Sequence, residues 1–415
     1  MPELGIIADD LTGAMDTANE VAARGYETIV VSVPNASPSV ATVVAINTDS
    51  RYATPADAAD AVWSGVDAVG AATVYKKIDS TLRGNIGPEV AAALRATAAD
   101  LAVVAPAFPA TGRRTWGGVH WVNETPVAET EFAADRNGPP SSTVTDLFTA
   151  QGFPVERVDG ADVAESADRV AARFSGAVRR HDQPPILVCD ARTTSHLETI
   201  AAAGAGFDAL FVGSGGLASH LRLDIPADSP PVVPEPGPGA PLAVVGSVSE
   251  TTLEQLDRVP DRQLFHLDPH SVLDGDTDEA AAVADRLDRD LPTVLTAASE
   301  RSTVDETLAA GRDRGLSDGE VRDRVATGLA TVAADACRIT PPSGLFYTGG
   351  DVAVAGLHAL DATTVSLSGA TVDAGIPIGH LADGDVADIL LITKAGGFGT
   401  ETTIVNCLDT LDGEQ

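Results

Sequence analysis

Short apolar runs alternate with helical patterns along the whole chain, and this alternation restricts the fold more than any other feature. The run LGIIA at 4–8 precedes a polar break, DDLTG, and a helical pattern that Gly25 closes. Further apolar runs are ETIVVSV, TVVAI, LAVVAP, PILVCD and ALFVG, with alanine-rich segments between them. Because strands that alternate with helices form a mostly parallel sheet flanked by helices, the sequence predicts the α/β class.

A proline-rich stretch at 224–241, DIPADSPPVVPEPGPGAP, interrupts this alternation. Proline can neither continue a helix nor pair in a central strand, so we interpret the stretch as a semi-rigid linker. After it, LAVVGSVSETTLEQL restarts the order of strand, loop and helix. The sequence thus predicts two α/β domains, at 1–223 and 242–415.

The charge balance is strongly acidic, with 60 Asp and Glu against 27 Lys and Arg and a net charge of −33. The acids are dispersed along the chain, and lysine is nearly absent while arginine persists. Self-repulsion on this scale destabilises a compact state at ordinary ionic strength, whereas concentrated salt screens it. The composition therefore favours a halophilic protein over an ordinary acidic one.

The same composition argues against several partners and locations. Nothing resembles the basic stripe of a nucleic-acid-binding protein, and no apolar run is long enough to span a membrane. The N-terminus lacks the basic region of a signal peptide, and the three cysteines stand apart, as buried thiols in a reducing compartment do. We expect a cytoplasmic protein without nucleic-acid or membrane partners. The oligomeric state stays open, with a homo-oligomer among the alternatives.

Two of the three lysines stand side by side in the segment YKKIDSTLRGN. Its polar residues are Lys76, Lys77, Asp79, Ser80, Thr81 and Arg83. A solvated charged loop is the ordinary explanation, but the avoidance of lysine elsewhere speaks against it. Cations for a carboxylate, together with acids and hydroxyls for alcohols, suit a small polyhydroxylated anion.

Asp9 and Asp10 directly follow the first apolar run, and Asp16 lies one turn into the next helical pattern. Helix capping is the simple explanation, because Asp before a helix satisfies free N–H groups. Capping needs one such residue, however, and two adjacent carboxylates repel each other. Paired carboxylates at a strand end can bind sugar hydroxyls, hold a metal or accept a proton, so we favour a functional pair.

Two other segments carry weaker signals. The stretch 105–132 is long enough for a functional loop, and its His120 could be a base, although a lone histidine is more often structural. Gly213, Gly215 and Ala218 fit the dinucleotide fingerprint G-x-G-x-x-G/A. The acid that the fingerprint requires on a following strand is missing, because the proline-rich stretch comes next, so we reject NAD binding.

The second domain has three small glycine-containing turns after apolar runs: GSVS at 246–249, TGGD at 348–351 and KAGGFG at 394–399. Any one of them could be a plain turn. Three together resemble a cradle in which backbone N–H groups meet phosphate oxygens. No Walker A sequence is present, so a nucleotide site here would be of another type.

In this order, ADDLTGAMDTA, YKKIDSTLRGNIGPEV, APAFPATGRRTWGGVHWVN, VAETEFAAD, TGGD and TKAGGFG resemble the four-carbon acid sugar kinases. The similarity runs from Ile6 to about Asn406. It implies an N-terminal acid-sugar-binding domain and a C-terminal nucleotide-binding domain, with the active site in the cleft between them. It also implies transfer of the γ-phosphoryl of ATP, with Mg²⁺, to the terminal hydroxyl of 3-oxo-tetronate, D-threonate or D-erythronate.

By this resemblance, the sugar-acid site would comprise Asp9, Asp10, Lys77, Asp79, Ser80, Thr81, Arg83 and Gly84. ATP would be held by Ser247, Ser249, Gly349, Gly350, Asp351, Val352, Gly396 and Gly397. The family commonly has threonine where Val352 stands, which puts a hydroxyl contact in doubt. Lys394 directly follows the run ILLIT, at the end of a strand where a phosphate could lie, and the alternative is a structural pair with an acid such as Asp351. The metal ligands stay unassigned.

The implied mechanism consists mainly of positioning and charge neutralisation. Arg83 and Lys77 would anchor the substrate carboxylate, and Asp10 or Asp9 would orient or deprotonate the attacking hydroxyl. Two alternatives stay open: a kinase for a longer or differently oxidised sugar acid, and a non-catalytic sugar-acid-binding regulator. The sequence does not determine the preferred tetronate.

Overall fold

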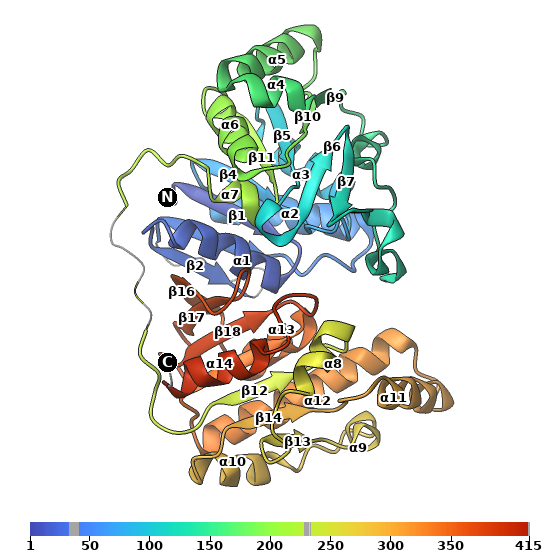
Figure 1. Cartoon of the computed structure of the whole chain (residues 1–415), viewed down its shortest axis with the longest axis vertical. Coiled ribbons are helices and arrows are strands. Elements are labelled where there is room, and N and C mark those ends of the chain that lie inside the picture. The colour runs from blue at the N-terminus through green and yellow to red at the C-terminus, as the bar shows by residue number, and fades with distance from the viewer. Residues whose placement is uncertain (33–40, 228–231, 233, 414–415) are drawn as a thin grey trace. The chain divides into compact units, whose positions relative to one another are not determined.

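The chain divides into two compact units, Met1–Pro230 and Pro231–Gln415, in a computed structural model that describes residues 1–32, 41–227, 232 and 234–413 (Figure 1). Of the linker predicted at 224–241, residues 228–231 and 233 lie outside the described residues. Within the described ranges, no helix is both long enough and apolar enough to cross a membrane.

The first unit contains a parallel sheet with the strand order β2-β3-β1-β4-β11-β5-β10-β9. Its strands are β1 (Leu4–Ala8), β2 (Thr28–Val31), β3 (Val43–Asn47), β4 (Thr73–Lys77), β5 (Leu101–Ala105), β9 (Val155–Val158), β10 (Ile186–Cys189) and β11 (Ala209–Gly213). Its helices are α1 (Leu11–Ala22), α2 (Pro55–Val69), α3 (Ile86–Thr97), α4 (Gly160–Glu165), α5 (Ala167–Arg180), α6 (Thr194–Gly204) and α7 (Gly215–Ala218). Every residue of β1 is buried, which requires cover on both faces of the sheet.

The segment at 105–132, expected as a long loop, contains a small antiparallel sheet. Its strands are β6 (Arg113–Trp116), β7 (Val119–Val122) and β8 (Thr125–Pro126), paired in that order. Short 3₁₀ turns flank it: η1 (Pro109–Thr111), η2 (Val127–Glu129), η3 (Glu131–Ala134) and η4 (Val144–Phe148). Hydrogen bonds between these strands therefore order residues that the sequence analysis expected to be in a loop.

The second unit has the strand order β13-β14-β12-β15-β18-β17-β16, in which β17 pairs antiparallel with both of its neighbours. Its strands are β12 (Leu242–Val245), β13 (Leu264–His266), β14 (Thr293–Thr296), β15 (Gly344–Thr348), β16 (Thr364–Thr371), β17 (Pro377–Leu381) and β18 (Leu390–Lys394). Its helices are α8 (Glu250–Leu256), α9 (Pro269–Leu273), α10 (Ala280–Asp288), α11 (Arg301–Asp313), α12 (Asp318–Ile339), α13 (Gly350–Ala359) and α14 (Thr403–Asp412). The predicted α/β class is confirmed for both units.

Candidate functional site

In the first unit, polar side chains gather where three neighbouring strands end. Asp9 and Asp10 follow β1, Arg51 follows β3, and Asp79 with Arg83 follows β4. The order β3-β1-β4 makes these strands neighbours, and the carboxyl ends of parallel strands meet at one edge of the sheet. We call this group of five residues the first edge.

Arg51 lies at the centre of the first edge. Its Nε donates to Asp9 Oδ2 over 2.7 Å, and its Nη2 donates to Asp10 Oδ1 over 2.6 Å. Asp9 is 2% exposed, and burial alone would raise the pKa of its carboxyl. Arg51 and Lys76 outweigh burial, so the pKa of Asp9 lies below its ordinary value. Asp9 is therefore ionised at neutral pH and held by Arg51.

Arg83 and Asp79 form a second ion pair at the first edge. Arg83 Nε donates to Asp79 Oδ2 over 2.7 Å and its Nη2 donates to Oδ1 over 3.1 Å, which is bidentate geometry. Burial opposes ionisation, but Arg83 and Arg51 bring the pKa of Asp79 well below its ordinary range. The Arg83 guanidinium also lies 5.4 Å from the centroid of the Phe132 ring. These contacts orient Arg83.

Asp10 both caps a helix and pairs with Arg51. It caps α1, because its Oδ1 accepts from Gly13 N over 3.2 Å, and its Oδ2 accepts from Thr12 Oγ1 over 2.7 Å. The same Oδ1 also accepts from Arg51. Capping therefore accounts for one carboxylate of the adjacent pair, while Arg51 removes the repulsion between them.

The adjacent lysines point to opposite faces of the sheet, because side chains alternate along a strand. Lys76 is fully buried, and its Nζ lies 2.9 Å from Glu89 Oε2. Ser50 Oγ donates to the other oxygen of Glu89 over 2.8 Å, so Lys76 belongs to an internal ion pair. Lys77 is 3% exposed, and its ammonium makes no ion pair or hydrogen bond with any residue of the described ranges.

His120 of β7 fixes the backbone beside the first edge. Its Nε2 lies 2.9 Å from the Ser80 carbonyl oxygen, and its Nδ1 lies 3.0 Å from Thr115 Oγ1. Burial lowers the pKa of His120 to about 4, so the ring is neutral at physiological pH. A neutral ring that donates from Nε2 leaves Nδ1 to accept from the hydroxyl. His120 thus positions Ser80 and has no free nitrogen with which to act as a base.

Two further predicted residues shape the loop after β4. The Thr81 hydroxyl donates to Asp79 Oδ2. Gly84 has a φ of 93°, and a Cβ added to it would lie 3.0 Å from Asp9 Oδ2. Glycine therefore lets the backbone pass close to this carboxylate.

In the second unit, the three glycine-containing turns follow β12, β15 and β18, which are also neighbours in their sheet. We call these turns the second edge. The carbonyl oxygen of Gly396 accepts from Ser249 Oγ over 2.7 Å and from Thr252 Oγ1 over 3.0 Å. A Cβ at Gly396 would lie 2.3 Å from Ser247 Oγ, so any larger residue there would displace this hydroxyl. These contacts join the turn after β12 to the turn after β18.

Lys394 is fully buried beneath the last turn. Its Nζ donates over 3.2 Å both to the Gly396 carbonyl oxygen and to Thr252 Oγ1. It also lies 3.3 Å from the carbonyl oxygen of Ala395 and 3.4 Å from that of Phe398. Burial lowers its pKa to about 8. The ammonium thus orders the KAGGFG turn, and a direct contact with a nucleotide stays a prediction.

The remaining predicted nucleotide residues lie at the start of α13. Gly349 has a φ of 108°, and a Cβ there would lie 3.1 Å from Ser247 N. Val352 is 2% exposed and packs on Gly246, where an added Cβ would meet the Val352 Cβ at 2.8 Å. Asp351 is exposed in the first turn of the helix. The side chain of Val352 therefore packs inward and that of Asp351 faces solvent.

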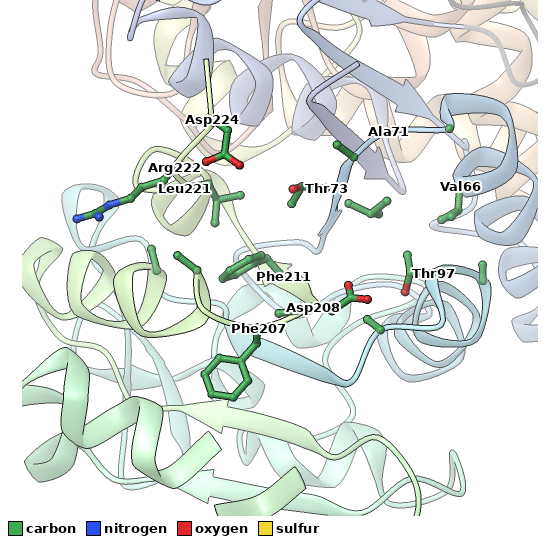
Figure 2. Close-up of a pocket in the computed structure, with 18 of the residues that line it drawn as sticks. Val66, Ala71, Thr73, Thr97, Phe207, Asp208, Phe211, Leu221, Arg222 and Asp224 are labelled. Carbon is green, nitrogen blue, oxygen red and sulfur yellow. The ribbon is translucent and has the colours of Figure 1, made fainter. Parts of the chain in front are cut away.

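A separate cavity of about 660 Å³ opens at the amino ends of β4 and β11 in the first unit (Figure 2). Its lining includes Thr73, Phe207, Asp208 and Phe211. No predicted site residue lines it. Among the described residues, no group of three or more His, Cys, Asp or Glu side chains is arranged to hold a metal ion.

Sequence reasoning missed two residues of these edges, Arg51 and Thr252. Arg51 stands in NTDSRY, just beyond the run TVVAI, so its place after a strand was a usable signal. Thr252 had no such signal, because its role depends on Gly396, a residue far away in the sequence.

Comparison with known proteins supplies independent information on both units. Residues 4–221 match the family described as "Sugar-binding N-terminal domain", and residues 242–404 match "Nucleotide-binding C-terminal domain". A D-threonate kinase of Salmonella typhimurium is 35% identical, with 97% of each chain covered. A D-erythronate kinase of Heliobacterium modesticaldum is 32% identical, with 99% of this chain and 98% of that protein covered.

A third relative and a solved structure complete the comparison. A 3-oxo-tetronate kinase of Methylobacterium radiotolerans is 33% identical, with 98% of this chain and 99% of that protein covered. The crystal structure of Haemophilus influenzae protein HI1011 aligns with a TM-score of 0.76 at 23% identity, over 99% of each chain. That structure supports the fold.

Proposed function

Since this chain belongs to the four-carbon acid sugar kinase family, we propose that it transfers the γ-phosphoryl group of ATP to the terminal hydroxyl of a four-carbon sugar acid. The observation that carries the proposal is the first edge, where Arg51 and Arg83 are paired with carboxylates, a set of groups that suits a small polyhydroxylated anion. 3-Oxo-tetronate, D-threonate and D-erythronate are the candidate substrates, because relatives are named for each.

In the proposed complex, Arg83 binds the carboxylate of the sugar acid. Its side chain is 21% exposed, so part of the guanidinium is open to a ligand while Asp79 holds the remainder. The carboxylates that Arg51 fixes, Asp9 and Asp10, would accept hydrogen bonds from substrate hydroxyls. Because these groups are oriented before binding, little ordering is left to oppose association.

The second edge is the proposed ATP site. The carbonyl of Gly396 is bound to Ser249 and Thr252, which fixes the turn. The backbone N–H groups of Gly396 and Gly397 would then bind phosphate oxygens. Mg²⁺ is commonly held by one or two carboxylates together with substrate phosphates, and exposed Asp351 fits that requirement. When bound, the ion would offset phosphate charge.

The proposal extends to the environment of the protein. A net charge of −33 with scarce lysine supports a cytoplasm of high salt concentration. The free cysteines, Cys189, Cys337 and Cys407, are all buried, as expected in a reducing compartment.

ATP consumption with a panel of tetronates tests the proposed function. The panel contains D-threonate, D-erythronate, 3-oxo-tetronate and longer sugar acids, assayed in concentrated potassium chloride. We expect ADP to form only with a four-carbon acid. Turnover of a longer acid alone would favour a divergent kinase, and tetronate binding without any ADP would favour a regulator.

A further inference from the structure

The carboxylates of the first edge are all engaged, which leaves the acceptor of the substrate proton unassigned. Asp9 and Asp10 share Arg51, and Asp79 is held bidentately by Arg83. The arginine partners favour the ionised, unprotonated form of Asp9 and Asp79, whose pKa values they lower. A weak base of this kind is poorly suited to accept a proton near neutral pH.

Asp16 differs from these three acids. It is half-buried in α1, and its carboxylate accepts no hydrogen bond from any residue in the described parts of the chain. The pKa of Asp16 is raised to about 6, mainly because burial removes water from the carboxylate. The negative charge of Asp10 adds to this rise, whereas the positive charges of Lys77 and Arg113 oppose it. The carboxylate lies against α7, since a Cβ at Gly215 would be 3.3 Å from Asp16 Oδ2.

The environment of Lys77 is a second, independent indication that an anionic ligand binds beside the first turn of α1. Lys77 is 3% exposed, and its ammonium makes no hydrogen bond or ion pair with any described residue, although it acts electrostatically on Asp9, Asp79 and Asp16. Burying an ammonium without a hydrogen-bonded partner is costly. A Cβ added to Gly13 would lie 2.6 Å from Lys77 Nζ and 2.4 Å from Asp10 Oδ1. The ammonium therefore lies over the first turn of α1, next to Asp10, and acts electrostatically on Asp16 one turn further on.

The charged and titratable groups that face Asp16 come from several elements of the first unit. They are Lys77 and Tyr75 of β4, Asp10 before α1, Glu20 of α1 and Arg113 of β6, while α7, with the sequence GGLA, contributes no charged or titratable residue. Glu20 lies one turn beyond Asp16, and burial together with Asp16 raises its pKa to about 7. Glu20 therefore serves as the matched control.

We propose that Asp16 is the general base of the phosphoryl transfer and that Lys77 offsets negative charge at the reacting end of the substrate. The assignment rests on the proposed function. The Asp16 carboxylate takes the proton of the terminal hydroxyl as the hydroxyl oxygen bonds to the γ-phosphorus of ATP. The bond from that phosphorus to the β,γ-bridging oxygen breaks, and its electron pair leaves with ADP. Arg83 then holds the carboxylate end of the sugar acid.

The test compares wild type, Asp16→Asn and Glu20→Gln by steady-state kinetics between about pH 5 and about pH 9, with tetronate affinity measured by calorimetry. In wild type, kcat should fall below about pH 6, because a protonated Asp16 cannot accept the proton. Asp16→Asn should lower kcat by about 10²- to 10⁴-fold and abolish this acid limb, with tetronate affinity nearly unchanged. Glu20→Gln should keep both kcat and the limb.

Several outcomes would overturn the assignment. These are a near-normal kcat in Asp16→Asn, an acid limb that persists in that variant, or a loss of tetronate affinity as large as the loss of kcat. If Asp16→Asn does not fold, the wild-type profile still decides, because a kcat that is flat through pH 6 excludes Asp16 as the base. If the wild-type protein transfers phosphate to no tetronate, the proposed function itself is overturned. If both wild type and Asp16→Asn are active, the proposed function stands and only the assignment of Asp16 is overturned.

Discussion

The first and second edges occupy the same position in two parallel sheets, yet they are ordered by different interactions. At the first edge, buried or half-buried ion pairs between arginines and carboxylates hold the side chains. At the second edge, hydroxyls and one buried lysine hold backbone carbonyl groups. Under the proposed function, the first edge would recognise its ligand through side-chain charge and the second edge through backbone N–H groups.

Removing salt should have the largest effect, because it acts on the surface of both units. With a net charge of −33, we expect loss of secondary structure in dilute buffer and recovery in concentrated potassium chloride. Circular dichroism across a potassium chloride series measures this. A full native signal in dilute buffer would contradict the halophilic interpretation.

Arg51→Ala should strongly destabilise the first unit, because Asp9 would stay buried without its partner. Breaking a buried ion pair in this way costs about 3–5 kcal/mol in the free energy of unfolding. Denaturant unfolding in high salt measures the loss. Arg314→Ala, which breaks an exposed pair with Asp274, is the control and should change stability little. Equal effects of the two variants would show that the first edge is not held by its ion pairs.

Arg83→Ala should raise the KM for the tetronate by about ten- to hundredfold, because a charge-assisted contact with the carboxylate is lost. The KM for ATP should change little, since Arg83 lies in the first unit. Steady-state kinetics with each substrate varied in turn measures both values. A parallel loss of ATP affinity would assign Arg83 to the nucleotide.

Lys394→Met should have the smallest of these effects and should act at the second edge alone. Loss of the ammonium removes one of the three donors to the carbonyl of Gly396 and loosens the turn, so we expect ATP to bind about three- to tenfold more weakly while tetronate binding stays intact. Calorimetry measures both ligands on one variant. Unchanged ATP affinity together with unchanged turnover would show that the hydroxyls of Ser249 and Thr252 suffice to hold the turn.

The sequence alone determined the α/β class and placed polar groups after apolar runs. Both follow from local physics, since burial on both faces selects continuous apolar strands and parallel strands deliver their carboxyl ends to one edge. The segments containing Asp9, Asp79 and Arg83 were identifiable for this reason. The resemblance carried by the same segments pointed to the family before any contact was known.

Only the tertiary structure decided which charges are partners. Lys76 and Lys77 are adjacent in the sequence, yet Lys76 forms an ion pair with buried Glu89, whereas Lys77 makes no ion pair or hydrogen bond within the described residues. Arg51 and Asp9, or Thr252 and Gly396, are joined across long stretches of chain. Ion pairs and hydrogen bonds depend on distances of about 3 Å, which spacing along the chain does not specify but the packing of the strands does.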